Sequence, residues 1–339
     1  MKALTLRGIH KSYGELEVLK GLDLDVEEGT VYGFLGRNGA GKSTALRAVM
    51  GITYADSGDI ELLGESLASD DPKARQQVGY VAQEQHFYDW MTSASIGRFV
   101  AGFYPSWDNA EYKRLIKLLE IPTGRKIRGF SGGNHAKLAL ALALATRPRL
   151  LLLDEPTAGM DAVARREFID IVREQARNDR RTTLFSSHLI DEVERAADQV
   201  GVMDMGKMRF EGTLDDLRNC VRRYVYEPGM LHSRRTPREW MAPRAIVDSM
   251  SDADAQARND LSQSQLLQVL MGEHSDAAKV LRNEALAAGD QRSAGRALIV
   301  ELPAGFSISD HVQLPVGWRR EPISLEDIFV AMVGKQVTL

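Results

Sequence analysis

Residues 36–43 read Gly-Arg-Asn-Gly-Ala-Gly-Lys-Ser, a composition and spacing that suit a loop holding phosphate. Glycines let backbone N–H groups close around phosphate oxygens, and the start of a helix favours negative charge. The Lys42 ammonium can reach the outer phosphates of a nucleotide, and the Ser43 hydroxyl can ligate Mg²⁺. A turn that only packs is the plainer alternative, but an apolar segment precedes this loop and a helical pattern follows it. The residues therefore predict a nucleotide-phosphate site.

A second chemical signal is the apolar run Leu150–Leu153, which ends in Asp154 and Glu155. Doubly wound sheets place ligands at the carboxyl ends of their strands. Asp154 can hold Mg²⁺ through water, and Glu155 can polarise an attacking water. Leucine-rich strands often end in Asp by accident, so the pair gains its meaning from the phosphate loop upstream. Together the two motifs indicate a nucleotide phosphohydrolase of the P-loop type.

The segment Gly129–Gly133 offers a rival interpretation, because Gly-Phe-Ser-Gly-Gly matches the nucleophile elbow of serine hydrolases. Asp154 and His188 even follow Ser131 in the required order. The elbow needs an apolar strand leading into its serine, whereas residues 124–128 are Gly-Arg-Lys-Ile-Arg. A hydrolase would also leave the phosphate loop unexplained, so we disfavour it.

The phosphate loop needs a strand before it and a helix after it, and the sequence supplies both. Residues 30–35 are apolar enough for a buried strand, and residues 42–51 have one apolar helical face. Further strands are predicted upstream at residues 4–9 and 16–26, and a short one downstream at residues 78–81.

Residues 92–145 have a helical pattern. Asp108 is a plausible N-cap for a helix reaching Leu119. Residues 138–145 alternate Leu and Ala, a period of two that also suits a strand. We predict a helix there, because Ala is the best helix former and residues 131–133 supply a helix start.

A regular alternation of strands and helices follows. The predicted segments are a strand at 150–153, a helix at 161–175, a strand at 182–185, a helix at 189–197, and strands at 200–203 and 207–210. Strands alternating with helices imply a largely parallel sheet covered on both faces. The fold class is therefore α/β.

The composition and periodicity of the sequence change after residue 222. Residues 228–265 mix Arg, Pro, Asp and Ser without a firm period, and a helix at 276–287 and a strand at 297–302 follow. A capping-box-like pattern at Ser324 predicts a last helix toward Val333. We expect residues 1–222 and 223–339 to form separate domains, the second small and α+β. Regulation and simple support of a dimer both stay open as its role.

Composition bounds the functional classes. The chain has 339 residues, with 43 basic and 47 acidic side chains, so a basic face for nucleic acid is not indicated. A single cysteine, Cys220, excludes a disulfide framework and favours a cytosolic protein. The most apolar stretch, Leu138–Leu153, is interrupted by Thr-Arg-Pro-Arg, and no apolar run follows the first residues. We expect neither a membrane span nor a signal peptide.

These motifs occur in the order found in a known family. Over residues 1–222 the chain resembles the ATP-binding subunit of an ABC transporter. The resemblance rests on Tyr13 as the adenine-stacking aromatic, residues 36–43 as Walker A, Gln83 as the Q-loop, 131–134 as the signature, 150–155 as Walker B, 158–161 as the D-loop, and His188 as the switch histidine. Asn134 departs from the glutamine that usually ends the signature, and the contact of that side chain is left open.

The resemblance implies a P-loop core with an antiparallel β-subdomain and a helical subdomain at about residues 84–145. It implies ATP and Mg²⁺ as cofactors, with Glu155 activating water and Lys42 and His188 stabilising γ-phosphate charge. The implied nucleotide-contacting residues are Tyr13, Gly36, Asn38, Gly39, Gly41, Lys42, Ser43, Thr44, Gln83, Ser131, Gly132, Gly133 and Asp161. The implied metal-binding residues are Ser43, Gln83 and Asp154.

Partners follow from the same resemblance. The signature closes on ATP held by a second nucleotide-binding subunit, identical or different, and an integral membrane permease is the coupled partner. Residues 103–108 and 324–329 are similar to bacterial drug or peptide exporters, so the resemblance implies export rather than import. Coupling to the permease implies a cytoplasmic chain that lies on the inner face of the cell membrane. Soluble relatives in translation or DNA repair are the alternative. One P-loop, no heptad run and no basic excess disfavour them.

Overall fold

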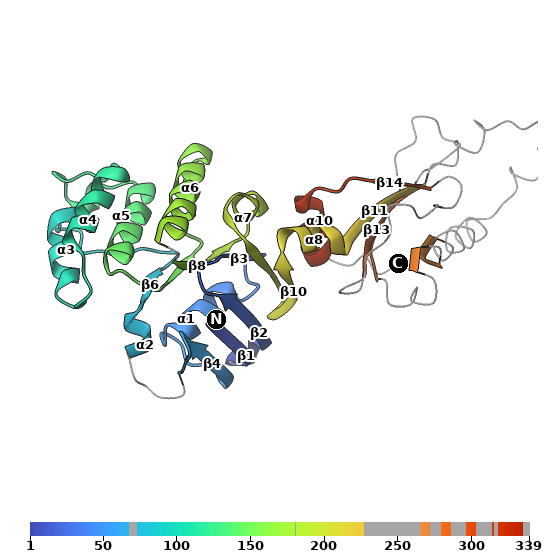
Figure 1. Cartoon of the computed structure of the whole chain (residues 1–339), viewed down its shortest axis with the longest axis horizontal. Helices are drawn as coiled ribbons and strands as arrows, with labels where there is room; N and C mark the ends of the chain where they lie inside the picture. Colours follow the sequence, from blue (N-terminus) through green and yellow to red (C-terminus); the bar gives the residue numbers. More distant parts are fainter. Residues whose placement is uncertain are drawn as a thin grey trace, which may run out of the picture. The chain divides into compact units, whose positions relative to one another are not determined.

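The computed structural model describes residues 1–67, 73–179, 181–226, 266–268, 270–271, 279–285, 296–302, 314 and 318–334. The chain divides into two compact units, Met1–Leu214 and Asp215–Leu339 (Figure 1). The boundary predicted after residue 222 falls inside strand β11 (Val221–Tyr226), so the division comes earlier than expected. The reason is that β11 pairs with C-terminal strands, which ties it to the second unit.

A six-stranded sheet in the order β10-β9-β3-β8-β7-β6 forms the centre of the first unit. Its strands are β3 (Val31–Gly36), β6 (Val78–Val81), β7 (Leu150–Asp154), β8 (Thr182–Ser187), β9 (Gln199–Asp204) and β10 (Lys207–Thr213). All neighbours run parallel except the β9–β10 hairpin. Every residue of β3, β7 and β8 is buried, as expected for parallel strands covered on both faces.

Helices cover the two faces of this sheet. Tyr32 and Phe34 of β3 share a hydrophobic core with α1 (Lys42–Val49). A Cβ built on Gly33, which lies between them, would come within 2.6 Å of Val193 in α7 (Ile190–Ala196). Because successive strand residues point to opposite faces, α1 and α7 lie on opposite sides of β3. The helix α6 (Ala162–Asp179), the longest among the described residues, packs beside α7.

An antiparallel sheet in the order β2-β1-β4-β5 lies over α1. Its strands are β1 (Lys2–Tyr13), β2 (Leu16–Glu27), β4 (Ser57–Leu62) and β5 (Glu65–Ser66). The first two strands confirm the prediction, whereas the mostly polar β4 was not predicted. Leu4, Leu6, Leu22 and Leu24 form the buried face of this sheet.

The remaining helices of the first unit are α2 (Lys73–Gln76), α3 (Ser93–Ala101), α4 (Asn109–Leu118), the 3₁₀ turn Ile127–Gly129, and α5 (Gly132–Ala145). Asp108 caps α4 as predicted, because its side chain accepts a hydrogen bond from Glu111 N. The alternating Leu and Ala residues of α5 are helical and buried almost all round. Figure 1 draws α3, α4 and α5 together, apart from α1 and the antiparallel sheet.

The second unit contains an antiparallel sheet in the order β12-β13-β11-β14. Its other elements are β12 (Lys279–Ala285), β13 (Arg296–Glu301), β14 (Trp318–Glu321), α8 (Leu214–Cys220) and α10 (Leu325–Val333). The helix predicted at 276–287 is wrong, because β12 pairs along its length with β13 and buries Leu281. The helix predicted from Ser324 is confirmed, and Ser324 Oγ accepts from Asp327 N at 3.0 Å. Residues 228–265 lie outside the described part.

None of the helices within the described ranges combines the length and the apolarity needed to cross a bilayer.

Candidate functional site

The phosphate loop joins the end of β3 to the start of α1, as the sequence predicted. Gly39 and Gly41 have φ values of 83° and 111°, a region that side chains other than glycine avoid. A Cβ on Gly36 would lie 2.6 Å from the Met203 carbonyl oxygen. No side chain caps α1 at Gly41, so its first backbone N–H groups are left for an anion.

Lys42, Glu155 and His188 converge beside this loop. Lys42 Nζ lies 3.1 Å from Glu155 Oε1 and donates a hydrogen bond of 2.7 Å to the Gly36 carbonyl. His188 Nδ1 lies 3.1 Å from the other carboxylate oxygen, Glu155 Oε2. Lys42 and Glu155 are buried, whereas His188 is exposed. One carboxylate thus lies between two nitrogen groups that come from different elements.

The backbone at Glu155 is held in an unusual conformation. Its φ of 42° is in the left-handed region, and its N–H donates to Ser186 Oγ at 2.9 Å. Such strained residues persist only where their surroundings fix them, and they concentrate at functional sites. The neighbouring strand β8 therefore fixes where the Glu155 carboxylate emerges.

Asp154 is completely buried and accepts two hydroxyl hydrogen bonds at Oδ1, from Ser43 at 2.9 Å and from Ser186 at 2.8 Å. Burial raises the pKa of Asp154 above its usual value. Among the described residues, none provides a hydrogen-bond partner for Asp154 Oδ2, although this atom is buried. Hydroxyl and carboxylate oxygens suit a hard cation, so the pair Ser43 and Asp154 fits Mg²⁺.

Gln83 and Tyr13 lie at the periphery. Gln83 is exposed and follows β6, whose Val81 is paired with Leu153 of β7, so it leaves the sheet at the same edge as Asp154. Tyr13 ends β1 with about half of its surface exposed, and Lys11 Nζ lies 5.6 Å from the ring centroid. Both side chains are accessible to a ligand.

Asp161 has a local role in the structure. Its Oδ1 accepts hydrogen bonds from Val163 N and Ala164 N, both at 2.9 Å, which caps the start of α6. These backbone donors lower the pKa of Asp161 below its usual value. The charged form of this carboxylate is therefore favoured at the end of the 158–161 turn.

The signature residues lie at the start of α5. Ser131 is the N-cap and accepts from Asn134 N at 3.3 Å. Ser131 and Gly132 are exposed, and a Cβ on Gly132 would meet nothing within 4 Å. In Figure 1 helix α5 is drawn apart from α1, the helix that the phosphate loop opens.

The serine-hydrolase interpretation fails on this geometry. Ser131 follows the 3₁₀ turn Ile127–Gly129 rather than an apolar strand. His188 contacts Glu155, and Asp154 contacts Ser43 and Ser186. No catalytic triad is therefore assembled around Ser131 in the described structure.

The sequence analysis missed one buried charge near the site. Glu192, in the first turn of α7, is only 4% exposed and accepts hydroxyl hydrogen bonds from Thr157 and Ser187. Its spacing of four residues after His188 was the only available signal. That spacing alone does not distinguish a buried carboxylate from a solvated one.

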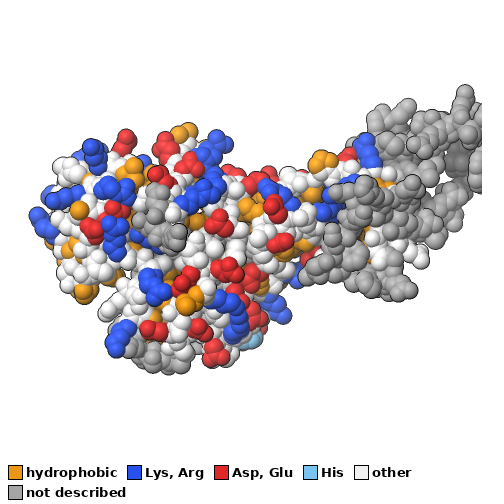
Figure 2. All heavy atoms as spheres, viewed as in Figure 1, with side chains coloured by type: hydrophobic (Ala, Val, Ile, Leu, Met, Phe, Trp, Pro, Cys, Tyr) orange, Lys and Arg blue, Asp and Glu red, His pale blue; other side chains and the backbone are white. Residues whose placement is uncertain are grey.

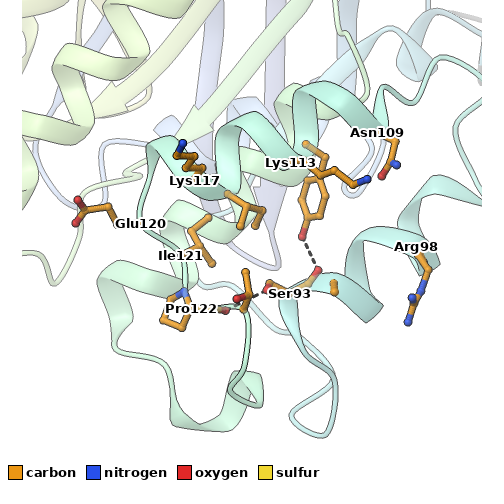
Figure 3. A pocket seen from close by; sticks show the side chains of 12 residues that line it. Ser93, Arg98, Asn109, Lys113, Lys117, Glu120, Ile121 and Pro122 are labelled. Carbon is orange, nitrogen blue, oxygen red and sulfur yellow. Dashed lines mark hydrogen bonds between the residues drawn. The ribbon is translucent and has the colours of Figure 1, made fainter.

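A cavity of about 810 Å³ lies between α3 and α4 (Figure 3). Tyr112 donates to the Ser93 carbonyl at 2.6 Å, and Ser93 Oγ donates to the Pro122 carbonyl at 3.0 Å. Lys113 and Lys117 contribute to its rim, and Figure 2 shows many Lys and Arg side chains over this end of the unit. No phosphate-loop residue lines this cavity, so it is separate from the site above.

The fold and the two loops at the carboxyl edge of the sheet define a P-loop nucleotide-binding protein. A family model described as "ABC transporter" matches residues 19–158. The ATP-binding protein YtrB of Bacillus subtilis is 34% identical over 215 residues, covering 63% of this chain and 73% of YtrB. The linearmycin resistance ATP-binding protein LnrL of Bacillus subtilis is 35% identical over 219 residues, covering 63% of this chain and 70% of LnrL.

The solved structures agree. A structure described as the ATP-binding subunit of an ABC transporter superposes with a TM-score of 0.57 at 27% identity, covering 64% of this chain and 92% of that one. This chain belongs to the ABC transporter family, among its nucleotide-binding ATP-binding subunits. The alternatives in translation, DNA repair and serine hydrolysis find no support in these matches.

Proposed function

We propose that this chain hydrolyses ATP to ADP and phosphate and that the reaction drives a separate membrane permease. The observation that carries the proposal is the position of the Glu155 carboxylate between Lys42 Nζ and His188 Nδ1, beside the Ser43–Asp154 pair. A carboxylate there can orient and polarise the attacking water, and the two nitrogens can stabilise charge on the γ-phosphate.

Each part of the phosphate loop has a task in this proposal. The backbone N–H groups that would surround the phosphates come from Gly36, Asn38, Gly39, Gly41 and Thr44. Lys42 exchanges its carbonyl partner for phosphate oxygens. Mg²⁺, when bound, neutralises phosphate charge, and Ser43, Asp154 and Gln83 are the residues that would hold it. Tyr13 offers its exposed ring to the adenine base.

The complete site requires two chains in this proposal. Ser131, Gly132 and Gly133 form the start of α5, where Ser131 and Gly132 are exposed. A second nucleotide-binding subunit would present these residues, with Asp161 nearby, to ATP on the first phosphate loop. The start of a helix favours the negative charge of the phosphates.

The permease would dock on an exposed aromatic cluster that follows Gln83 in sequence. The cluster contains Tyr88, Trp90, Phe99 and Phe103, with successive ring centroids between 5.2 and 6.0 Å apart. All four rings are substantially exposed, and exposed groups of aromatic residues are typical of protein interfaces. Docking there would place the chain on the inner face of the membrane. A resistance protein such as LnrL among the relatives supports export as the direction of transport.

Docking can be tested by co-expressing the chain with its permease. Phe103→Ser should reduce the amount of permease that co-purifies, without changing the ATPase rate of the isolated chain. Ile52→Ser is the matched control, because Ile52 is similarly exposed but lies outside the cluster. Equal recovery of permease with both variants would argue against this surface.

The hydrolysis is tested with Glu155→Gln, which keeps the size of the side chain and removes its charge. Phosphate release should fall by roughly 100-fold or more, the usual scale for losing a general base. ATP binding should persist, because residues 36–43 and Asp154 are unchanged. Uncleaved ATP should then hold two chains together, which light scattering with Mg²⁺-ATP would detect as a dimer.

Lys42→Ala is the control for this experiment. It removes the phosphate-binding ammonium, so neither ATP binding nor ATP-dependent dimerisation should be retained. A Glu155→Gln protein that releases phosphate at the wild-type rate would remove Glu155 from the mechanism.

A further inference from the structure

Glu192 joins the two segments that carry Glu155 and His188. Its Oε1 accepts from Thr157 Oγ1 at 2.6 Å, and its Oε2 accepts from Ser187 Oγ at 2.6 Å. Thr157 lies two residues after Glu155, and Ser187 directly precedes His188. Both hydroxyls are almost completely buried with the carboxylate, so the hydrogen bonds form away from solvent.

These contacts close a ring through the site. Glu155 is linked along the backbone to Thr157, whose hydroxyl donates a hydrogen bond to Glu192. Glu192 also accepts a hydrogen bond from Ser187, the residue before His188. His188 Nδ1 lies 3.1 Å from Glu155 Oε2, which closes the ring. Hydrogen bonds from hydroxyls to a carboxylate are among the strong ones at this length. The ring thus holds the two segments together at two points, one of them the Glu155–His188 contact itself.

The alternative is that Glu192 only stabilises the start of its own helix. Glu192 occupies the third position of α7, where a glutamate usually reaches back to the N–H of the N-cap residue. Here the N-cap residue is Leu189, and its N–H donates to Ser187 Oγ at 3.0 Å instead. The Glu192 carboxylate therefore serves the Glu155 loop and the His188 segment, with Arg165 Nε 3.4 Å away to offset its charge.

We infer that Glu192 is a positioning residue for ATP hydrolysis, which holds His188 in register with Glu155 through Ser187 and Thr157. This role rests on the proposed ATPase function. Burying a carboxylate is costly unless it is paired, and Glu192 is satisfied by these partners.

The test measures steady-state ATPase kinetics of the full chain. Glu192→Ala should lower kcat by about 10- to 100-fold, the scale of a small misplacement of catalytic groups. The KM for ATP should change little, because the phosphate loop is untouched. Glu192→Gln should restore part of the rate, since an amide can retain at least one of the two hydroxyl contacts. Asp191→Ala, which removes an exposed carboxylate from the same helix, should behave as wild type.

A double-mutant cycle with His188→Ala decides whether Glu192 acts through the histidine. If it does, Glu192→Ala should lower the rate by less than about twofold in the His188→Ala background. An equal loss in both backgrounds, or a raised KM with unchanged kcat, would overturn the role of Glu192.

If Glu192→Ala does not fold, the variants Thr157→Val and Ser187→Ala test the positioning role of Glu192 instead. Each breaks one contact of the ring, and each should lower kcat without raising KM. Wild-type KM and kcat in both variants would overturn the inference. A wild-type chain without ATPase activity would overturn the proposed function and this inference together, whereas additive losses in an active protein overturn only the inference.

Discussion

Two helices of the first unit begin at glycine-rich turns, and the two starts differ in what surrounds them. The start of α1 is enclosed: Lys42 is buried, Ser43 contacts Asp154, and Lys42 contacts Glu155. The start of α5 is open: Ser131 and Gly132 are exposed, and Ser131 Oγ accepts a hydrogen bond from Asn134 N in its own helix turn. The first start is thus surrounded by charged side chains of the same chain, whereas the second faces solvent.

The difference shows why similar backbone chemistry can serve two roles. Both helix starts present N–H groups that favour an anion. Only the first has charged side chains beside it, namely Lys42 of α1 and the carboxylates Asp154 and Glu155 at the end of β7. In our proposal, the second adds its N–H groups to a phosphate that is bound by another chain. Each of the following predictions alters one start and compares the outcome with the other.

Ser131→Arg should have the largest effect on turnover. The bulky side chain would occupy the exposed start of α5 and block its approach to a phosphate. We expect phosphate release to fall by more than roughly 100-fold, the scale of losing preorganised donors at a reacting phosphate. Nucleotide binding to the single chain should persist, because the start of α1 is intact. A fluorescent-nucleotide titration beside the ATPase assay measures both.

Mixing two inactive variants sharpens this comparison. A dimer of one Ser131→Arg chain and one Lys42→Ala chain contains one site with an intact phosphate loop and an intact signature. The mixture should therefore recover measurable ATPase activity that neither variant has alone. If the mixture stays inactive although mixed dimers form, the two starts do not share a site across chains.

Gly41→Ala should destabilise the protein, whereas Gly132→Ala should not. Gly41 has a φ of 111°, and an added Cβ would lie 2.9 Å from Leu19 Cδ2. We expect the free energy of unfolding to fall by about 1–3 kcal/mol. Gly132 lies in the first turn of α5 with open space around it, so alanine should change stability by no more than about 1 kcal/mol. Urea unfolding measures both, and equal losses would contradict the contrast.

Asn134→Gln should have the smallest effect. The Asn134 backbone N–H makes the capping hydrogen bond to Ser131, and this bond does not depend on the side chain. We expect kcat to change by less than about threefold, the scale of a substitution away from special features. A tenfold change in either direction would show that the side chain itself contacts the nucleotide.

Local sequence was enough to predict an element where a single short segment contains all the residues that define it. The phosphate loop follows β3 and opens α1, and Asp154 ends β7, as predicted. Ser324 begins α10 because its hydroxyl needs only the N–H of Asp327, three residues away. Glycine spacing, helix caps and apolar periods act over a few residues, so the sequence reports them directly.

Long-range pairing was decided only by the tertiary structure. Residues 279–285 have helix-forming composition, yet backbone pairing with β13 and the burial of Leu281 make them a strand. β4 has a mostly polar sequence, so the sequence gives little indication of a strand. Its backbone pairing with β1 makes it one. The boundary between the units lies before the predicted one for the same reason, because β11 pairs with strands far along the chain.

The same division holds within the site. The sequence by itself predicted which side chains would bind phosphate and polarise water: Lys42, Ser43, Asp154 and Glu155 all come from local motifs. Only the tertiary structure decided that Glu155 lies between Lys42 and His188, and that Glu192 ties the two segments together. A motif fixes the chemistry of its own residues. The distance between two motifs depends on strand order and burial, which arise only when the whole sheet is assembled.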